Sequence, residues 1–284
     1  MRWMPGGRSD NLEDRRAEGG GRGFGVMPRI GLGGIVVLLV LSVIFRRDLV
    51  TPFLSAGGAG QAGSEATAEA NTAEEPVVQF VSFVLDDAQA TWTKILPTTG
   101  QQYQPAKLVL FRDAINSACG FAQAATGPFY CPLDQRVYID LGFYQELKDR
   151  FGAPGDFAQA YVLAHEIGHH VQNLLGTDRE MRRAQQARPE QANALSVRLE
   201  LQADCYAGVW GHSTEQRQLL DPGDVEEGIR AAAAVGDDRI QKMSVGRVNP
   251  DAFTHGTSEQ RVAWFRRGYQ TGRPDVCNTF DSSR

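Results

Sequence analysis

The sequence has little of what several large classes of protein need. Its 34 acidic residues outnumber its 29 basic ones and give a net charge of -5, so it lacks the excess of positive charge that is typical of proteins that bind nucleic acid. It has no Gly-x-Ser-x-Gly motif, which argues against a serine nucleophile of the α/β-hydrolase type. It has no close Cys-x-x-Cys pair, which argues against zinc held by cysteine, and no internal repeat. It contains only five histidines, so each can be considered singly.

The one long apolar run is short for a membrane span. Residues 30–45 are apolar and lie between Arg29 and the pair Arg46 and Arg47. As a helix this run extends about 24 Å, whereas the hydrocarbon core is about 30 Å thick, and snorkelling arginines can supply the difference. Because the 29-residue leader is long and the run is bounded by charges on both sides, we predict an uncleaved anchor. Arginines are more numerous before the run than after it, which predicts a cytoplasmic amino terminus with the bulk of the chain outside. The alternative is the apolar region of a cleaved signal peptide.

The chain is therefore expected to have four parts. Residues 1–29 are rich in Gly and Arg and have too few apolar residues for a core, which predicts a disordered cytoplasmic tail. Residues 30–45 are the predicted transmembrane anchor. Residues 46–75 include a stretch of Ala, Gly, Ser, Thr and Glu that is typical of a flexible linker. Residues 76–284 are enough for one well-buried domain.

Within that domain, strand patterns precede helical ones. Residues 107–111 and 137–141 are short apolar or alternating runs that predict strands. Pro76 is expected to be the first residue of a helix, residues 191–210 are expected to form another, and residues 219–243 to add one more. Strands before the central helix and helices after it predict an α+β fold with a small sheet.

The most informative pattern is His165-Glu166-Ile167-Gly168-His169. On a helix that turns about 100° per residue, the two histidines lie on one face, one turn apart, so both imidazoles can bind a single ion. Glu166 lies beside them and is placed to hold a water molecule rather than the metal. The same string can also occur by chance on a surface helix that binds no metal.

The residues around this motif favour the metal-binding interpretation. Asp156 is the predicted N-cap of the helix, with Gln159 completing a capping box, and Gly176 is the predicted stop. Between them, apolar residues recur at steps of three and four, which predicts a helix that is buried on most of its surface. Histidines on such a helix need a partner, and a metal ion is the partner that this spacing favours.

A catalytic zinc site needs a third protein ligand and a fourth position that stays open for water. Glu200 is the best candidate for the third ligand. Asp204 lies one turn later on the same face and would accept a hydrogen bond from the far nitrogen of a zinc-binding histidine. Ala203 is small enough to let this helix lie close to the first. The alternative for a Glu and an Asp at this spacing is an ordinary solvated helix face.

The other three histidines have different predicted roles. His170 is about 140° away from the ligand face, so we expect a structural hydrogen-bonding role, and His212 is expected at the surface or as a C-cap. His255 precedes residues 257–260, whose Thr-Ser-Glu-Gln pattern predicts a capping box at the start of a helix. A loop there could direct the imidazole into a cleft as a donor to the developing oxyanion. A structural loop histidine is the equal alternative.

Together these parts predict a membrane-anchored peptide hydrolase that uses one Zn²⁺ ion. Zinc activates a water molecule and polarises the scissile carbonyl, while Glu166 is the general base that takes the proton of the water and passes it to the leaving amine. One alternative is a catalytically silent, zinc-bearing binding protein of the cell envelope, although Glu166 argues against it because a structural site needs no base. Another is a non-peptide amide hydrolase that uses the same chemistry.

The four cysteines, Cys119, Cys131, Cys205 and Cys277, all follow the predicted anchor. An even number of cysteines in an exported domain suggests disulfides. Pairing the first with the second would close a small loop and leave the last two to pin the carboxyl-terminal tail to the Glu200 helix. Four cysteines allow three pairings, reduced and buried thiols are a further alternative, and the sequence does not choose among them.

Further blocks follow one another along nearly the whole chain. They are Arg2-Trp3, Ser9-Asp10-Asn11, Asp14-Arg15-Arg16, Cys119-Gly120, Gly127-Pro128-Phe129-Tyr130-Cys131-Pro132, Val137-Tyr138-Ile139-Asp140-Leu141, residues 165–170, residues 200–208, Gly236-Asp237-Asp238-Arg239 and Thr254-His255-Gly256-Thr257. In this order they resemble the bacterial neutral zinc metallopeptidase family of YpfJ-like proteins. The resemblance implies a single-span membrane protein with a zincin-type catalytic domain that acts on peptides or proteins. Residues 200–204 also resemble the third-ligand helix of HtpX-like membrane proteases, which supports Glu200 on zinc and Asp204 behind it.

Overall fold

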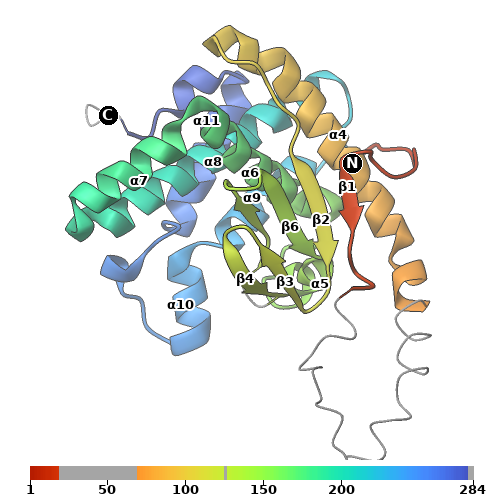
Figure 1. Cartoon of the computed structure of the whole chain (residues 1–284), viewed down its shortest axis with the longest axis horizontal. Coiled ribbons are helices and arrows are strands. Elements are labelled where there is room, and N and C mark those ends of the chain that lie inside the picture. Colours follow the sequence, from red (N-terminus) through yellow and green to blue (C-terminus); the bar gives the residue numbers. More distant parts are fainter. Residues whose placement is uncertain (19–68, 125–126, 281–284) are drawn as a thin grey trace, which may run out of the picture.

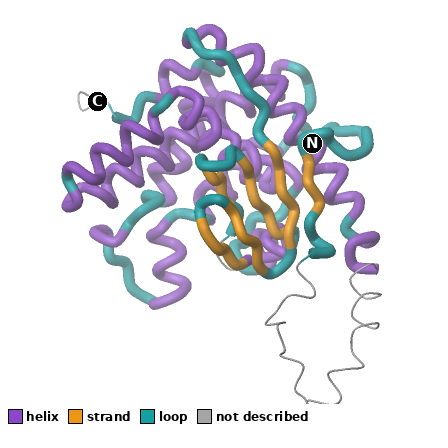
Figure 2. Tube along the Cα trace, viewed as in Figure 1, coloured by secondary structure: helices purple, strands orange, loops and turns teal. Residues whose placement is uncertain are grey.

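The computed structural model describes residues 1–18, 69–124 and 127–280. The strands are β1 (Leu12–Asp14), β2 (Lys107–Phe111), β3 (Ala114–Ser117), β4 (Gly120–Gln123), β5 (Phe129–Cys131) and β6 (Arg136–Asp140). The α-helices are α4 (Glu75–Ile95), α5 (Gly142–Asp149), α6 (Asp156–Leu175), α7 (Thr177–Ala187), α8 (Ala192–Gln216), α9 (Asp224–Ala234), α10 (Asp237–Val245) and α11 (Ser258–Thr271). Short 3₁₀ turns are η3 (Leu96–Thr99), η5 (Pro189–Gln191), η6 (Pro250–Ala252) and η7 (Pro274–Cys277). Helices predominate and the strands gather in one region (Figure 2), which confirms the mixed α+β class.

The main sheet has the strand order β1-β2-β6-β5. Strands β1 and β6 run parallel to β2, whereas β5 runs antiparallel to β6, and β1, β2 and β6 lie side by side in Figure 1. Because side chains alternate between the two faces of a strand, β2 and β6 contribute to two separate clusters. Leu108 and Leu110 pack into the main core with the helices, whereas Val109 and Phe111 pack on the other face against Ile115 of the β3–β4 hairpin.

Residues 1–18 are part of this domain. Strand β1 adds to the edge of β2, and the ring of Trp3 packs on that of Phe80 with 5.2 Å between their centroids. Arg16 is fully buried and its guanidinium lies 2.7 Å from the carboxylate of Glu74. The prediction of a disordered tail is therefore wrong for residues 1–18. These residues are too polar to form a core alone, but they add to a core that the rest of the domain provides.

The pairing of β1 with β2 also bears on membrane topology. Two strands that share backbone hydrogen bonds lie in one compartment, whereas a single crossing by residues 30–45 would separate residues 1–18 from the domain. The predicted arrangement, with a cytoplasmic amino terminus and an external domain, is not compatible with this pairing. The predicted anchor itself lies outside the described residues. Among the helices that the structure does describe, each is too short or too polar to span a bilayer.

The central helix α6 ends as predicted but begins differently. Gly176 follows its last residue with φ of 81°, a left-handed conformation that glycine adopts without a steric cost. The predicted N-cap, Asp156, is instead the first helical residue, and no side chain caps the helix. The carboxylate of Asp156 lies 3.0 Å from the amino group of Met1, so this charge pairs with the amino terminus instead of completing the predicted capping box with Gln159.

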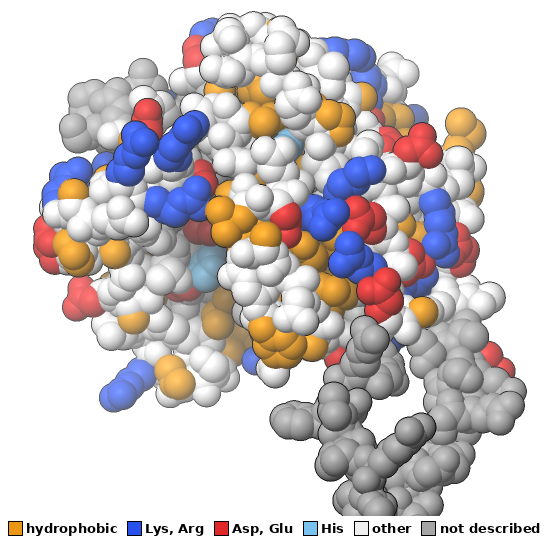
Figure 3. Space-filling view, in the orientation of Figure 1, with side chains coloured by type: hydrophobic (Ala, Val, Ile, Leu, Met, Phe, Trp, Pro, Cys, Tyr) orange, Lys and Arg blue, Asp and Glu red, His pale blue; other side chains and the backbone are white. Residues whose placement is uncertain are grey.

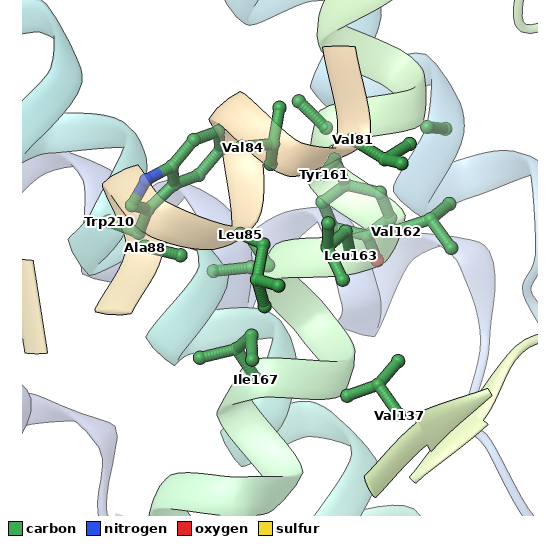
Figure 4. Packing of buried hydrophobic residues seen from close by; sticks show 14 of the residues in the cluster. Val81, Val84, Leu85, Ala88, Val137, Tyr161, Val162, Leu163, Ile167 and Trp210 are labelled. Carbon is green, nitrogen blue, oxygen red and sulfur yellow. The ribbon is translucent and has the colours of Figure 1, made fainter. Parts of the chain in front are cut away.

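The core lies where α6 meets α4 and the sheet. Figure 4 shows Leu163 and Ile167 of α6 beside Leu85 of α4, with Val137 of β6 on the other side. All four side chains have no exposed surface. Burying a side chain of this size contributes about 1.5–3 kcal/mol, so the motif helix is fixed along its apolar face. At about 100° per residue, His165 and His169 lie on the side of the helix opposite Ile167.

Small residues let α8 lie close to α6, and α11 close to α8. A Cβ atom on Gly168 would lie 3.0 Å from the carbonyl oxygen of Ala203, so α8 approaches α6 at the motif itself, as the small residue at position 203 predicted. A Cβ atom on Gly268 would lie 1.9 Å from the carbonyl oxygen of Cys205, so α11 crosses α8 at van der Waals distance. The three helices therefore hold their polar side chains in fixed relative positions.

The remaining predictions about elements are largely confirmed. The strands predicted at residues 107–111 and 137–141 are β2 and β6, within one residue. Residues 219–243 contain two helices, α9 and α10, rather than one. The chain turns at Gly236, where a Cβ atom would lie 2.4 Å from the backbone nitrogen of Ser258. The close approach of α11 therefore ends the alanine-rich helix.

Two disulfides join the described cysteines. Cys119 bonds Cys131 and Cys205 bonds Cys277, which is the pairing with a small loop and a pinned tail. The first ties the hairpin to β5. The second ties η7, which follows α11, to α8.

Candidate metal centre

Three predicted site residues converge at one point. His165 and His169 from α6 and Glu200 from α8 each offer a ligand atom, and these atoms lie within 4.8 Å of one another. The Nε2 atom of His165 is 3.2 Å from Glu200 Oε2, and that of His169 is 3.4 Å from Glu200 Oε1. Both Nε2 nitrogens thus face one carboxylate. Imidazole nitrogen and carboxylate oxygen are the donors that catalytic zinc sites use, so this cluster could hold one divalent ion.

The cluster lies in a cavity of about 590 Å³ that Glu166 and His255 also line. Figure 3 shows a histidine surface at the bottom of a recess, with hydrophobic side chains on either side of it. The apolar part of the lining includes Phe129, Phe143, Phe151, Val162, Val235 and Ile240. The cavity therefore combines a small group of convergent polar side chains with apolar walls, which is typical of a ligand site.

The far nitrogen of His165 is held by a buried ion pair. Its Nδ1 atom lies 2.9 Å from Asp204 Oδ1, and Asp204 also accepts hydrogen bonds from Tyr161 and from Arg261, at 2.8 and 2.9 Å. Burial alone would raise the pKa of Asp204, but the charge of Arg261 lowers it below its ordinary value. An ionised carboxylate only accepts, so Nδ1 of His165 carries a proton and Nε2 is the nitrogen that faces the cavity.

The charges of the cluster shift its pKa values in opposite directions. Burial by itself lowers the pKa of His165, but the charge of Asp204 and hydrogen bonds to Asp204 and Glu200 raise it to about 10. Burial raises the pKa of Glu200, but the charge of His169 and the hydrogen bond from His165 bring it below its ordinary value. Glu200 is therefore ionised, and its negative charge faces two imidazole nitrogens as a cation site requires.

The pKa of Glu166 shifts in the direction that burial alone would give, unlike the pKa values of His165 and Glu200. Its side chain is nearly buried in the cavity wall. Burial raises the pKa of Glu166, and the charges of His169 and His165 only partly oppose this shift. A carboxyl group whose pKa moves toward neutrality is suited to take up and release a proton near pH 7.

His255 reaches the same cavity from the loop between α10 and α11. The backbone N–H groups of Thr254, His255 and Gly256 all donate to Asp237 Oδ2, at 2.7, 2.6 and 3.0 Å, while the ring Nδ1 lies 3.2 Å from Asp237 Oδ1. This hydrogen bond is the main cause of the raised pKa of His255. The capping box that was expected at Thr257 is present. One carboxylate therefore fixes both the loop and the ring that it carries.

The other histidines lie outside the cluster. His170 is fully buried, bonds the carbonyl oxygen of Gln104 through Nε2 and lies 2.9 Å from the hydroxyl of Tyr130 through Nδ1, as its predicted structural role requires. His212 lies inside α8 rather than after it, because the helix continues to Gln216, and its Nδ1 donates to the carbonyl oxygen of Tyr269 at 2.7 Å.

The sequence reasoning missed the residues that support this site. Arg261 had a usable signal, because it lies four residues before Phe265 on one stripe of a predicted helix, and a cation on an apolar stripe needs an anion nearby. Both side chains are buried in the structure. Asp237 is the first residue of α10, where an acidic residue is common for reasons of helix charge alone. Gln172 also bonds a cluster histidine, since its Oε1 lies 2.8 Å from Nδ1 of His169. The two residues lie three apart on one helix, a spacing that makes side chains neighbours, so this contact had a signal in the sequence.

A match to a family model agrees with a zinc-binding site. A family model described as "Putative neutral zinc metallopeptidase" matches residues 1–280. The chain is 48% identical to the uncharacterized protein YpfJ of Escherichia coli (strain K12) over 289 residues, which covers 100% of both chains. It is 46% identical over 209 residues to the uncharacterized protein Rv2575 of Mycobacterium tuberculosis (strain H37Rv), which covers 70% of this chain and 69% of the relative. No solved structure matches the chain.

Proposed function

The chain belongs to the neutral zinc metallopeptidase family, and on that premise we propose that it hydrolyses peptide bonds in its cavity with one zinc ion and Glu166 as the general base. The observation that carries the proposal is the convergence of His165, His169 and Glu200 within 4.8 Å. Family membership indicates a peptidase. The zincin-type catalytic domain and the role of each residue are part of the proposal.

The donor atoms fit zinc. His165, His169 and Glu200 would hold the ion through two imidazole nitrogens and one carboxylate, the three-ligand set of many catalytic zinc sites. The fit is supported by the hydrogen bonds behind each histidine, which are made through Nδ1 and leave both Nε2 atoms facing Glu200, where each can bind an ion in place of a proton. When bound, zinc supplies a Lewis acid that polarises a carbonyl group and lowers the pKa of a nearby water molecule.

The protein's own groups then move the protons. Glu166 takes a proton from the attacking water and delivers it to the nitrogen of the leaving amine. His255 donates a hydrogen bond to the carbonyl oxygen of the substrate as negative charge develops there. The hydrogen bond to Asp237 raises the pKa of His255, which favours the protonated imidazole, and holds the ring at the cavity. The chemistry needs no covalent bond between the substrate and the protein.

The role of His255 can be tested through the pH dependence of catalysis. We expect His255→Ala to lower kcat/KM about 10²–10³-fold, the usual effect of losing one donor to a developing oxyanion. Asp237→Asn removes the hydrogen bond that raises the pKa of His255, so the imidazole loses its proton at lower pH and the alkaline limit of kcat/KM shifts downward. His212→Ala, outside the cavity, is the matched control. An unchanged pH profile in Asp237→Asn would leave His255 with a structural role only.

The apolar walls of the cavity favour polypeptide substrates with large apolar side chains. Phe143, Phe151 and Ile240 line it beside the polar cluster, so an extended chain could bury a side chain there while its backbone lies over His165 and His169. We expect the purified full chain to cut an unfolded protein next to apolar residues, to stop when a chelator removes zinc and to resume when zinc is restored. Turnover of small amides alone would instead favour a non-peptide amide hydrolase, and no turnover at all a silent binding protein.

For the location of the protein, we propose an oxidising compartment outside the cytoplasm. The support is the pair of disulfides, which persist in such compartments. Because β1 pairs with β2, residues 1–18 lie on the same side as the rest of the domain. Reporters fused to either terminus should therefore give the same compartment, and opposite compartments would contradict the β1–β2 pairing. Membrane attachment through residues 30–45 stays a prediction.

A further inference from the structure

A line of buried hydrogen bonds runs from the back of His169 toward the carboxyl-terminal part of the described chain. Nδ1 of His169 lies 2.8 Å from Gln172 Oε1. The amide nitrogen of Gln172 donates to the carbonyl oxygen of Leu199 at 2.7 Å and to Gln202 Oε1 at 3.1 Å. The amide nitrogen of Gln202 donates in turn to the carbonyl oxygen of Cys277 at 2.9 Å. Both glutamines are buried, with exposed fractions of 0% and 5%.

The two backbone carbonyls set the direction of every bond in this line. A carbonyl oxygen only accepts, so the NH₂ groups of Gln172 and Gln202 have to face Leu199 and Cys277. The amide oxygen of Gln172 then has to face His169. An oxygen in that position requires Nδ1 to be the protonated nitrogen of the neutral ring, which leaves the lone pair of Nε2 for the cavity. Reversing either amide would set oxygen against oxygen in a buried place, where no water can relieve it.

Both carbonyl groups that accept hydrogen bonds from this line are fixed on α8, the helix that carries Glu200. Leu199 immediately precedes Glu200 on α8, so Gln172 links one candidate ligand to the backbone that carries another. Cys277 belongs to η7 and is bonded to Cys205 of α8. The segment after α11 is therefore held on α8 by a covalent bond and by Gln202, and it presents a fixed acceptor to the far end of the line.

We propose that Gln172 and Gln202 are positioning residues of the zinc site, which set the tautomer and orientation of His169 through the carbonyl groups of Leu199 and Cys277. This role is independent of Asp204 and Arg261, which act behind His165. It rests on the proposed zinc site but not on which substrate the protein cleaves.

The test is zinc affinity in the full-length protein, measured by competition with a chromophoric chelator, together with the thermal midpoint of the metal-free protein. Methionine matches the size of glutamine but neither donates nor accepts comparably. We expect Gln172→Met to raise the zinc dissociation constant about 10–100-fold and Gln202→Met about tenfold, which is the usual range for groups behind a metal ligand. Gln89→Met is the matched control, because Gln89 is also buried, at 6% exposure, and bonds Tyr103 instead.

The double variant separates positioning from simple loss of packing. Gln202 acts on His169 only through Gln172, so we expect the Gln172→Met and Gln202→Met double variant to bind zinc as Gln172→Met alone does. Zinc affinities equal to those of the control, with a lower thermal midpoint only, would overturn the proposal, and so would losses in affinity that simply add.

A measurement on the unsubstituted protein covers the case in which these variants do not fold. In zinc-loaded protein labelled with ¹⁵N, the ring of His169 should keep its proton on Nδ1 and bind the ion through Nε2, and a ring bound through Nδ1 with its proton on Nε2 would overturn the proposal. Neither readout uses substrate. A protein that shows the expected tautomer and affinities but cleaves no peptide would contradict the proposed activity and leave this role intact.

Discussion

Glu166→Gln is expected to lower peptide cleavage about 10²–10⁴-fold, the range for losing a general base, while zinc stays bound at one ion per chain. Glutamine keeps the size of the side chain and its hydrogen bonding but cannot take a proton from water. Glu166 is not among the three side chains whose ligand atoms converge, so its loss should leave the metal in place. The measurement is kcat/KM on an unfolded protein together with the zinc content of the same sample.

A second carboxylate of the cavity provides the control. Glu146 lines the same cavity from α5, but its side chain is 55% exposed, so Glu146→Gln should keep near-normal activity. A Glu166→Gln variant that cleaves as fast as the unsubstituted protein would refute the assigned base. Loss of zinc together with activity would mean that Glu166 holds the metal site together rather than acting on water.

Arg261→Met is expected to lower the free energy of unfolding by about 3–5 kcal/mol, the usual cost of breaking a buried ion pair from one side. Asp204 has no exposed surface, and Arg261 is its only cationic partner at ion-pair distance among the described residues apart from His165. Removing the guanidinium leaves a carboxylate buried without a full counter-charge. The measurement is urea unfolding of the metal-free protein, so that zinc binding does not add to the stability.

Two further variants show whether the pair is responsible. Arg266 lies on the same helix but is exposed, so Arg266→Met should change the free energy of unfolding by less than about 0.5 kcal/mol. In an Asp204→Asn background the buried charge is already gone, and Arg261→Met should then cost clearly less than it does alone. Fully additive losses would contradict the pairing of these two residues.

The part of the site that the sequence predicts is the part that helix geometry fixes. His165 and His169 lie four residues apart on one helix, as do Glu200 and Asp204 on another, so each pair shares a face whatever surrounds it. The meeting of the two helices needs only small residues where they touch, and Gly168 opposite Ala203 supplies that contact. These relations follow from local spacing, and the structure brings the four side chains together accordingly.

The part that the sequence does not predict depends on distant segments. Strand β1 is only three residues long, and its Leu-Glu-Asp pattern has no apolar alternation, so it becomes a strand because the edge of β2 offers hydrogen bonds. Arg261 is 57 residues from Asp204 in the chain, and Cys277 is 75 residues from Gln202. Contacts of this kind arise from the crossing of α8 and α11, which no local pattern specifies.

The most direct test of the account is anomalous diffraction at the zinc absorption edge from crystals of the zinc-loaded full chain. We expect one peak about 2.0–2.2 Å from Nε2 of His165, Nε2 of His169 and a carboxylate oxygen of Glu200, the distances of zinc to nitrogen and oxygen ligands. A peak that lies away from these three side chains, or the absence of any peak in zinc-loaded crystals, would contradict the account.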